Sequence, residues 1–120
     1  MGTLVIDVSN NGTSATYARV SGPGTVNSDG EISFQGQGAG QQSITWNLSS
    51  GTFSTPPITM TDANGNSLPN GGSGAEFSWP ATGGSTSLTI TDEDDSGGGQ
   101  YNYCLKTSAG DLDPKIINRQ

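Results

Sequence analysis

The chain has 120 residues, of which 29% are hydrophobic and 19 are glycine, and it carries a formal net charge of -7. This length fits one domain over residues 1–120, and eleven acidic against four basic side chains disfavour nucleic acid, which is bound by clustered Lys and Arg. We find neither the roughly 18 successive apolar residues that span a bilayer nor a signal-peptide pattern, so we expect a soluble chain without membrane insertion. A lone Cys104 and the lack of His exclude an internal disulfide and the common Cys/His zinc sites.

Short segments with apolar side chains at every second position follow one another along the chain. The first two flank Asn11-Gly12, and Asn-Gly between such segments is the strongest short signal for a β-hairpin. Residues 42–48 place Ile44, Trp46 and Leu48 on one face. No segment has a helical apolar stripe, so we expect no helix. We expect about eight short strands, drawn from residues 3–9, 14–20, 25–27, 31–35, 42–48, 58–62, 76–80, 85–91, 100–107 and 115–118.

Turn-forming Gly, Asn and Asp separate these segments at about ten-residue intervals, a pattern typical of an antiparallel β-sandwich. A closed barrel is the alternative architecture. Residues 62–74 are rich in turn formers and are expected to be a loop, with or without a small hairpin. The alternation assigns these residues to the core: Leu4, Ile6, Val8, Tyr17 or Val20, Ile32, Phe34, Ile44, Trp46, Leu48, Ile58, Met60, Phe77, Trp79, Leu88, Ile90, Tyr101, Tyr103 and Leu105.

Two resemblances bear on the fold. Trp46 in a middle strand, with Tyr101 and Cys104 in a later one, resembles the immunoglobulin pattern of a strand-C tryptophan and a strand-F tyrosine. The family's first cysteine is absent, and Asn102 stands two residues before Cys104, so the resemblance implies an immunoglobulin-like sandwich without its disulfide. The segment DPKIIN, residues 113–118, resembles the C-terminal segment of the DP-EP family of small uncharacterised bacterial proteins. That resemblance implies a bacterial β-sandwich and carries over no functional residue.

Carboxylates are the main candidates for chemistry. Without His, Cys104 has no evident base, so we expect no enzyme and no catalytic residue. Calcium prefers oxygen ligands from loops rich in Asp, Asn and Gly, which makes Asp92, Asp94, Asp95 and Asp62 hypothetical calcium ligands. A solvated acidic loop at residues 92–95 and an Asn-Gly turn after Asp62 are the preferred interpretations, so no cofactor is expected and calcium is the one ion these loops suit.

Aromatic side chains also suit carbohydrate, whose rings stack on exposed indole faces. The alternation places Trp46 and Trp79 in the core, which we prefer over a sugar site. We therefore predict a non-catalytic binding or interaction module with a protein or glycan partner, or one that self-associates through edge strands. The alternatives are a calcium-dependent binding domain and a carboxylate-based hydrolase, in which Asp7 or Glu76 would supply the second carboxylate.

Overall fold

We describe the chain from a computed structural model over residues 2–10, 15–34, 41–72, 75–93 and 99–119. The described part is all-β, as predicted, and contains no helix, hence none that could span a membrane. The Asn11-Gly12 turn expected between the first two strands lies outside it. The ten strands are β1 (Thr3–Asn10), β2 (Ala15–Ser21), β3 (Thr25–Val26), β4 (Ile32–Ser33), β5 (Gln42–Leu48), β6 (Phe53–Asp62), β7 (Phe77–Ser78), β8 (Ser87–Asp92), β9 (Gly99–Thr107) and β10 (Gly110–Arg119).

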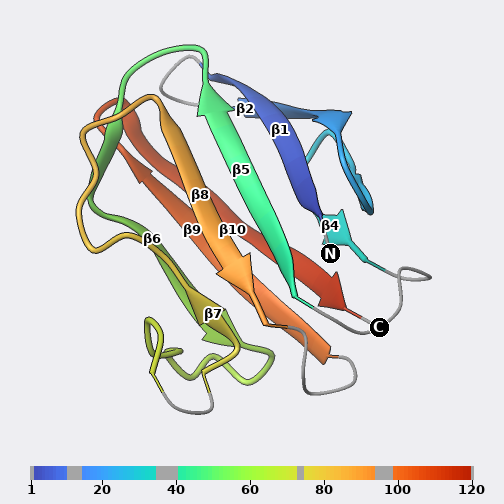
Figure 1. Cartoon of the computed structure of the whole chain (residues 1–120). Helices are drawn as coiled ribbons and strands as arrows, with labels where there is room; N and C mark the ends of the chain where they lie inside the picture. The colour runs from blue at the N-terminus through green and yellow to red at the C-terminus, as the bar shows by residue number, and fades with distance from the viewer. Residues whose placement is uncertain (1, 11–14, 35–40, 73–74, 94–98, 120) are drawn as a thin grey trace.

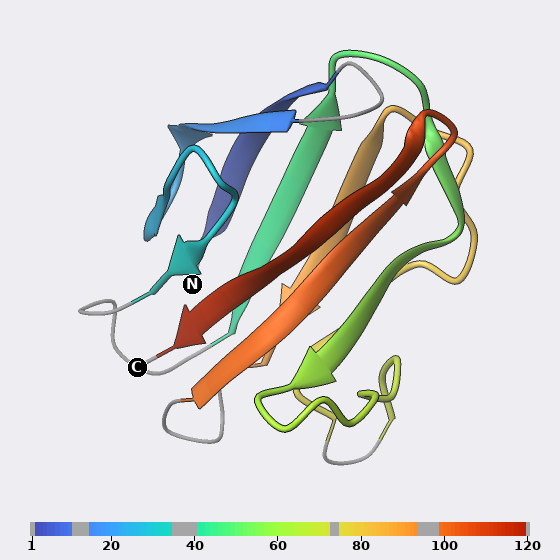
Figure 2. The same cartoon turned by 180° about the vertical axis from the view of Figure 1, so that it is seen from behind.

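The strands form two five-stranded sheets, with the orders β2-β1-β5-β8-β7 and β3-β4-β10-β9-β6. Figure 1 shows β5 and β8 in front of β9 and β10, and Figure 2, seen from behind, shows β10 and β9 in front. The sheets therefore face each other as two layers, in a sandwich-like arrangement. Each sheet ends in two edge strands, so the alternative of a closed barrel is wrong.

Two strand pairs run parallel, so the expectation of purely antiparallel sheets is wrong. β1 pairs in parallel with β5, with Ile6 opposite Trp46, and β10 pairs in parallel with β4. After β2 the chain contributes β3 and β4 to the second sheet before it returns to the first with β5. Alternation of apolar residues specifies the buried face of a strand but not the direction of its neighbour, so the sequence pattern could not show this.

Side chains from both sheets fill the space between the layers. Trp46 is 0% exposed, and its ring contacts that of Tyr103 from the opposite sheet at a centroid distance of 5.0 Å. The sequence left open whether Tyr17 or Val20 of β2 belongs to the core. Tyr17 is buried, whereas Val20 is 53% exposed. The remaining predicted core residues that are confirmed as buried are Leu4, Ile6, Val8, Ile32, Phe34, Ile44, Leu48, Ile58, Met60, Phe77, Leu88, Ile90 and Leu105.

Two parts of the core differ from the prediction. Trp79 and Tyr101 are only partly buried and pack against the rim of the core. Phe53 is buried although the sequence placed the start of its strand at Ile58. The strand begins earlier because β6 is an edge strand, where the missing N–H groups of Pro56 and Pro57 are tolerated.

Candidate functional site: a tryptophan-lined pocket beside β6 and β7

A pocket of about 340 Å³ opens on the side of the molecule where β6 and β7 lie. Each of these strands is an edge of one of the two sheets, and both lie at the left in Figure 1. The volume is at the lower end of the about 300–1,000 Å³ of small-ligand pockets. The residues that line the pocket are Pro56, Ile58, Thr59, Met60, Ser67, Leu68, Asn70, Trp79 and Ala81.

A bulge in β6 shapes one wall of the pocket. Phe53 lies opposite Thr107 of β9 and Ile58 lies opposite Leu105, so β6 advances five residues while β9 advances two. The extra residues of β6 include Pro56, which is exposed and lines the pocket. Bulges of this kind bend a strand and change the direction of its side chains, which here forms the start of the pocket wall.

The opposite wall is a segment that connects the edges of the two sheets. The N–H of Leu68 donates to the carbonyl of Met60 on β6 at 2.9 Å, and the N–H of Gly71 donates to the carbonyl of Phe77 on β7 at 2.9 Å. Thr61 and Ser67 also form an isolated antiparallel bridge. The loop expected after Asp62 therefore begins with a tight reversal and then covers the side of the sandwich.

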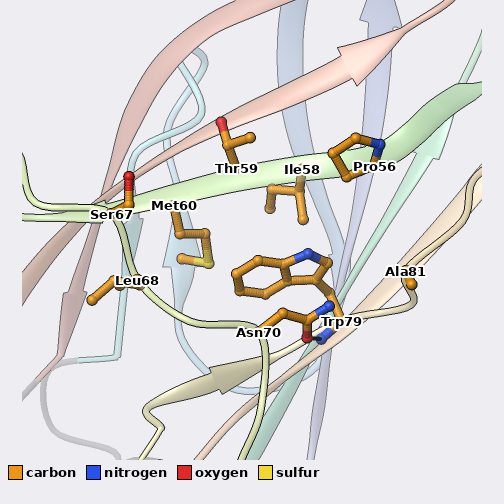
Figure 3. A pocket seen from close by; sticks show the side chains of 9 residues that line it. All are labelled: Pro56, Ile58, Thr59, Met60, Ser67, Leu68, Asn70, Trp79 and Ala81. Carbon is orange, nitrogen blue, oxygen red and sulfur yellow. Dashed lines mark hydrogen bonds between the residues drawn. The ribbon is translucent and has the colours of Figure 1, made fainter.

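Trp79 is the aromatic centre of the pocket. It follows β7 directly, at the edge of its sheet, and its backbone N–H donates to Asn70 Oδ1 at 2.7 Å. Figure 3 shows Ile58 and Met60 pointing from β6 toward the indole, with Asn70 on the other side of the ring. The prediction that Trp79 belongs to the core is thus only partly right, because β7 is the outermost described strand of its sheet and the side chain is left half-buried.

The pocket is electrically neutral. None of its nine lining residues carries an ionisable group. Polar atoms come from the carboxamide of Asn70 and the hydroxyls of Thr59 and Ser67, and Figure 3 shows both hydroxyls directed away from the indole. The walls nearest Trp79 therefore offer apolar contact and the polar group of one exposed asparagine.

Asp62, a hypothetical calcium ligand, acts as the cap of a turn. Its Oδ1 accepts the N–H of Asn64 at 2.8 Å and that of Asn66 at 3.0 Å, and its Oδ2 accepts from Asn66 Nδ2 at 3.3 Å. These bonds, that from the Asn66 backbone first, hold the pKa of the Asp62 carboxyl below its ordinary value of 3.8 because they favour the charged form. The interpretation of this segment as a turn is confirmed.

Asp92, a second hypothetical calcium ligand, does not join Asp62. Asp92 is 0% exposed on β8, directly opposite Gln42 of β5 and Phe77 of β7, whereas Asp62 ends a strand of the other sheet. Asp94 and Asp95 lie outside the described residues. Over the described ranges, no three His, Cys, Asp or Glu side chains form a group that could hold a metal ion.

The remaining candidates for chemistry are scattered. Asp7 is exposed on β1, and Glu76 is half-buried just before β7. Cys104 is half-buried on β9, and its Sγ lies 3.1 Å from the carbonyl oxygen of Leu112. None of the three lines the Trp79 pocket. Sequence reasoning missed this pocket because its walls come from a bulge and a loop; the available signal was Trp79 close to the end of a short strand.

Comparisons with family models, with curated proteins and with solved structures find no match for this chain.

Proposed function

We propose that this chain is a non-catalytic binding module that takes its ligand, or an inserted group of its partner, in the Trp79 pocket. The observation that carries the proposal is a half-buried tryptophan in a pocket whose lining has no ionisable side chain. A large aromatic surface that stays partly accessible is a common anchor for ligands and partners. General acid or base catalysis requires a titratable group close to the substrate, and the lining supplies none.

We further propose that the architecture is immunoglobulin-like. The orders β5-β8-β7 and β10-β9-β6 correspond to the B-E-D and G-F-C orders of that fold. In this correspondence Trp46 lies on the counterpart of strand B, not on that of strand C. β1 takes the place of strand A beside β5, although it pairs with β5 in parallel, and β2, β3 and β4 are additions to the family pattern. The proposed relation to the DP-EP family rests on residues 113–118, which belong to β10.

The covered edge of β6 favours a pocket ligand over an added strand. Phe53 exchanges backbone hydrogen bonds with the segment after Trp79, donating to Ser85 O at 2.8 Å and accepting from Gly84 N at 2.7 Å. Further along, Met60 O accepts from Leu68 N. Edge-strand pairing needs a row of unpaired N–H and C=O groups, and both ends of β6 are already occupied.

Binding of small neutral fragments, followed by backbone amide shifts in NMR spectra, tests the proposal. Cyclohexanol and N-acetylproline amide are suitable probes because they are uncharged and differ in polarity. We expect the shifts to concentrate on residues 56–60, 67–70 and 79–81 and to be lost in Trp79→Ala. Shifts that are absent, or that map to another face and persist in Trp79→Ala, would contradict the proposal.

A further inference from the structure

We propose that the ligand of the Trp79 pocket is a neutral carbohydrate, one of whose sugar rings stacks against the indole. The inference rests on the proposed binding function and names the chemical class of the ligand. A sugar ring has an apolar C–H face and a rim of hydroxyls, so it needs an aromatic surface next to a few uncharged hydrogen-bonding groups. The pocket brings Trp79 and Asn70 together in this way.

The lack of charged side chains in the pocket and the net charge of the chain both favour a neutral ligand. An acidic sugar would require Arg or Lys in the pocket, and the nine lining residues include neither. The formal net charge of -7 on the chain would in addition repel an anionic glycan approaching from solvent. A cationic ligand would lack a carboxylate partner within the lining, so a neutral sugar is the charge state that the pocket matches.

Asn70 is positioned to bind hydroxyl groups. Its Oδ1 accepts the backbone N–H of Trp79 at 2.7 Å, which fixes the carboxamide beside the indole. An asparagine carboxamide has two N–H donors on Nδ2 in addition to its oxygen, and these donors suit sugar hydroxyls. The side chain is exposed, so a ligand that lies on Trp79 can reach it.

Two features of the pocket disfavour an extended peptide as its ligand. Strand addition along β6 is blocked where Gly84 bonds to Phe53 and where Leu68 bonds to Met60. Proline-rich peptides dock in grooves lined with several aromatic side chains, and Trp79 is the single aromatic residue in this lining. Ring stacking on one indole is the chemistry that remains.

The test is a titration of the whole chain with a panel of neutral sugars: glucose, galactose, mannose, xylose, N-acetylglucosamine, cellobiose and maltose. Glucuronic acid is the charged counterpart of glucose. We expect at least one neutral sugar to bind, to shift the amides of the pocket and to bind more tightly than glucuronic acid. Trp79→Ala should weaken binding by about tenfold, which corresponds to about 1.4 kcal/mol of lost stacking, and Trp79→Tyr should weaken it less.

A matched pair of variants tests the role of Asn70. Asn64 and Asn70 are both exposed asparagines of the segment between β6 and β7, but only Asn70 lines the pocket. We expect Asn70→Ala to weaken sugar binding several-fold and Asn64→Ala to leave it unchanged. Equal effects of the two substitutions would overturn the assignment of Asn70 as a sugar-binding group.

The two proposals fail in different ways. If no sugar of the panel binds while cyclohexanol or N-acetylproline amide still shifts the pocket amides in a Trp79-dependent way, the carbohydrate inference is overturned and the binding function stands. If neither sugars nor fragments shift these amides, both are overturned. Binding that Trp79→Ala and Trp79→Tyr leave unchanged would place the sugar elsewhere and overturn the inference as well.

Discussion

Trp46 and Tyr103 lie on opposite sheets with their ring centroids 5.0 Å apart and their planes inclined by 41°. The hydroxyl of the same Tyr103 donates a hydrogen bond to the carbonyl of Gly30 at 2.6 Å. Gly30 lies in the turn between β3 and β4, so one chain of contacts runs from the first sheet through the core to that turn. This pair is one of the contacts through which buried side chains of the two sheets meet in the core.

The two tryptophans should differ in their effect on stability. Trp46 is 0% exposed, so Trp46→Ala should lower the free energy of unfolding by about 3–5 kcal/mol through lost contacts and a cavity. Trp79→Ala should cost clearly less because Trp79 is already half-exposed to water. Urea denaturation of both variants measures the difference. Equal losses would show that Trp79 is a core residue and would contradict the description of the pocket.

Stability should fall at alkaline pH through Tyr103. Burial, and then the nearby Tyr17, raise the pKa of Tyr103 above its ordinary value of 10.0, because the charged form is disfavoured inside the core. The unfolded chain then loses the proton before the folded chain does. The contribution of Tyr103 to the free energy of unfolding is therefore fully present below a pH of about 10. Above that pH it is lost at about 1.4 kcal/mol per pH unit.

Denaturation between pH 8 and pH 11, compared with Tyr103→Phe, measures this effect. The variant should be less stable at pH 8, because the buried carbonyl of Gly30 loses its donor at a cost of about 1–3 kcal/mol. Its stability should fall less steeply above pH 10. Parallel pH profiles for the two proteins would refute the role of Tyr103.

Gly30 should tolerate a side chain less well than a glycine of similar conformation elsewhere. Gly30 has φ +91°, and an added Cβ would lie 2.9 Å from Tyr17 Cε1 and 3.0 Å from Tyr103 Oη. Gly65 has φ +87° with nothing within 4 Å of that position, so Gly65→Ala introduces the backbone strain alone. We expect both alanine variants to lose stability, by about 1 kcal/mol for Gly65→Ala and by more for Gly30→Ala. Equal melting temperatures would argue against close packing around Tyr103.

Calcium should not act through Asp62. The carboxylate already accepts bonds from Asn64 and Asn66, and a cation would compete with these donors. We expect Asp62→Asn to shift the melting temperature equally in millimolar calcium and in chelator. A calcium-dependent rise that Asp62→Asn abolishes would restore the metal-site hypothesis at Asp62. A rise that persists in this variant would direct the search to residues 92–95.

Most of the core could be predicted from the sequence because the buried face of a strand follows from alternation. Gln42–Leu48 alternates buried and half-buried side chains over its whole length. The pairing direction of β1 and β5 could not be predicted, since it depends on the passage of the chain through the other sheet. Phe53 was missed because two prolines follow it, a pattern that usually marks the start of a strand and not its interior.

The candidate site was much less predictable than the core. Period-two alternation placed Trp79 inside, but it could not show that Trp79 follows a two-residue strand at the edge of the described sheet. Asn70 stood in a loop of turn formers without any distinguishing pattern. Its position against Trp79 results from one hydrogen bond between residues nine positions apart, which composition and spacing do not reveal.

The central claim is that ligand reaches Trp79 and not Trp46, and the two indole N–H signals of the chain test it most directly. Both signals can be assigned with Trp46→Phe and Trp79→Phe and then followed by NMR during titration with cellobiose, with cyclohexanol and with N-acetylproline amide. The account predicts that binding moves the Trp79 signal and leaves the signal of the buried Trp46 in place. A Trp79 signal that stays fixed in every titration would contradict it, as would a response confined to Trp46.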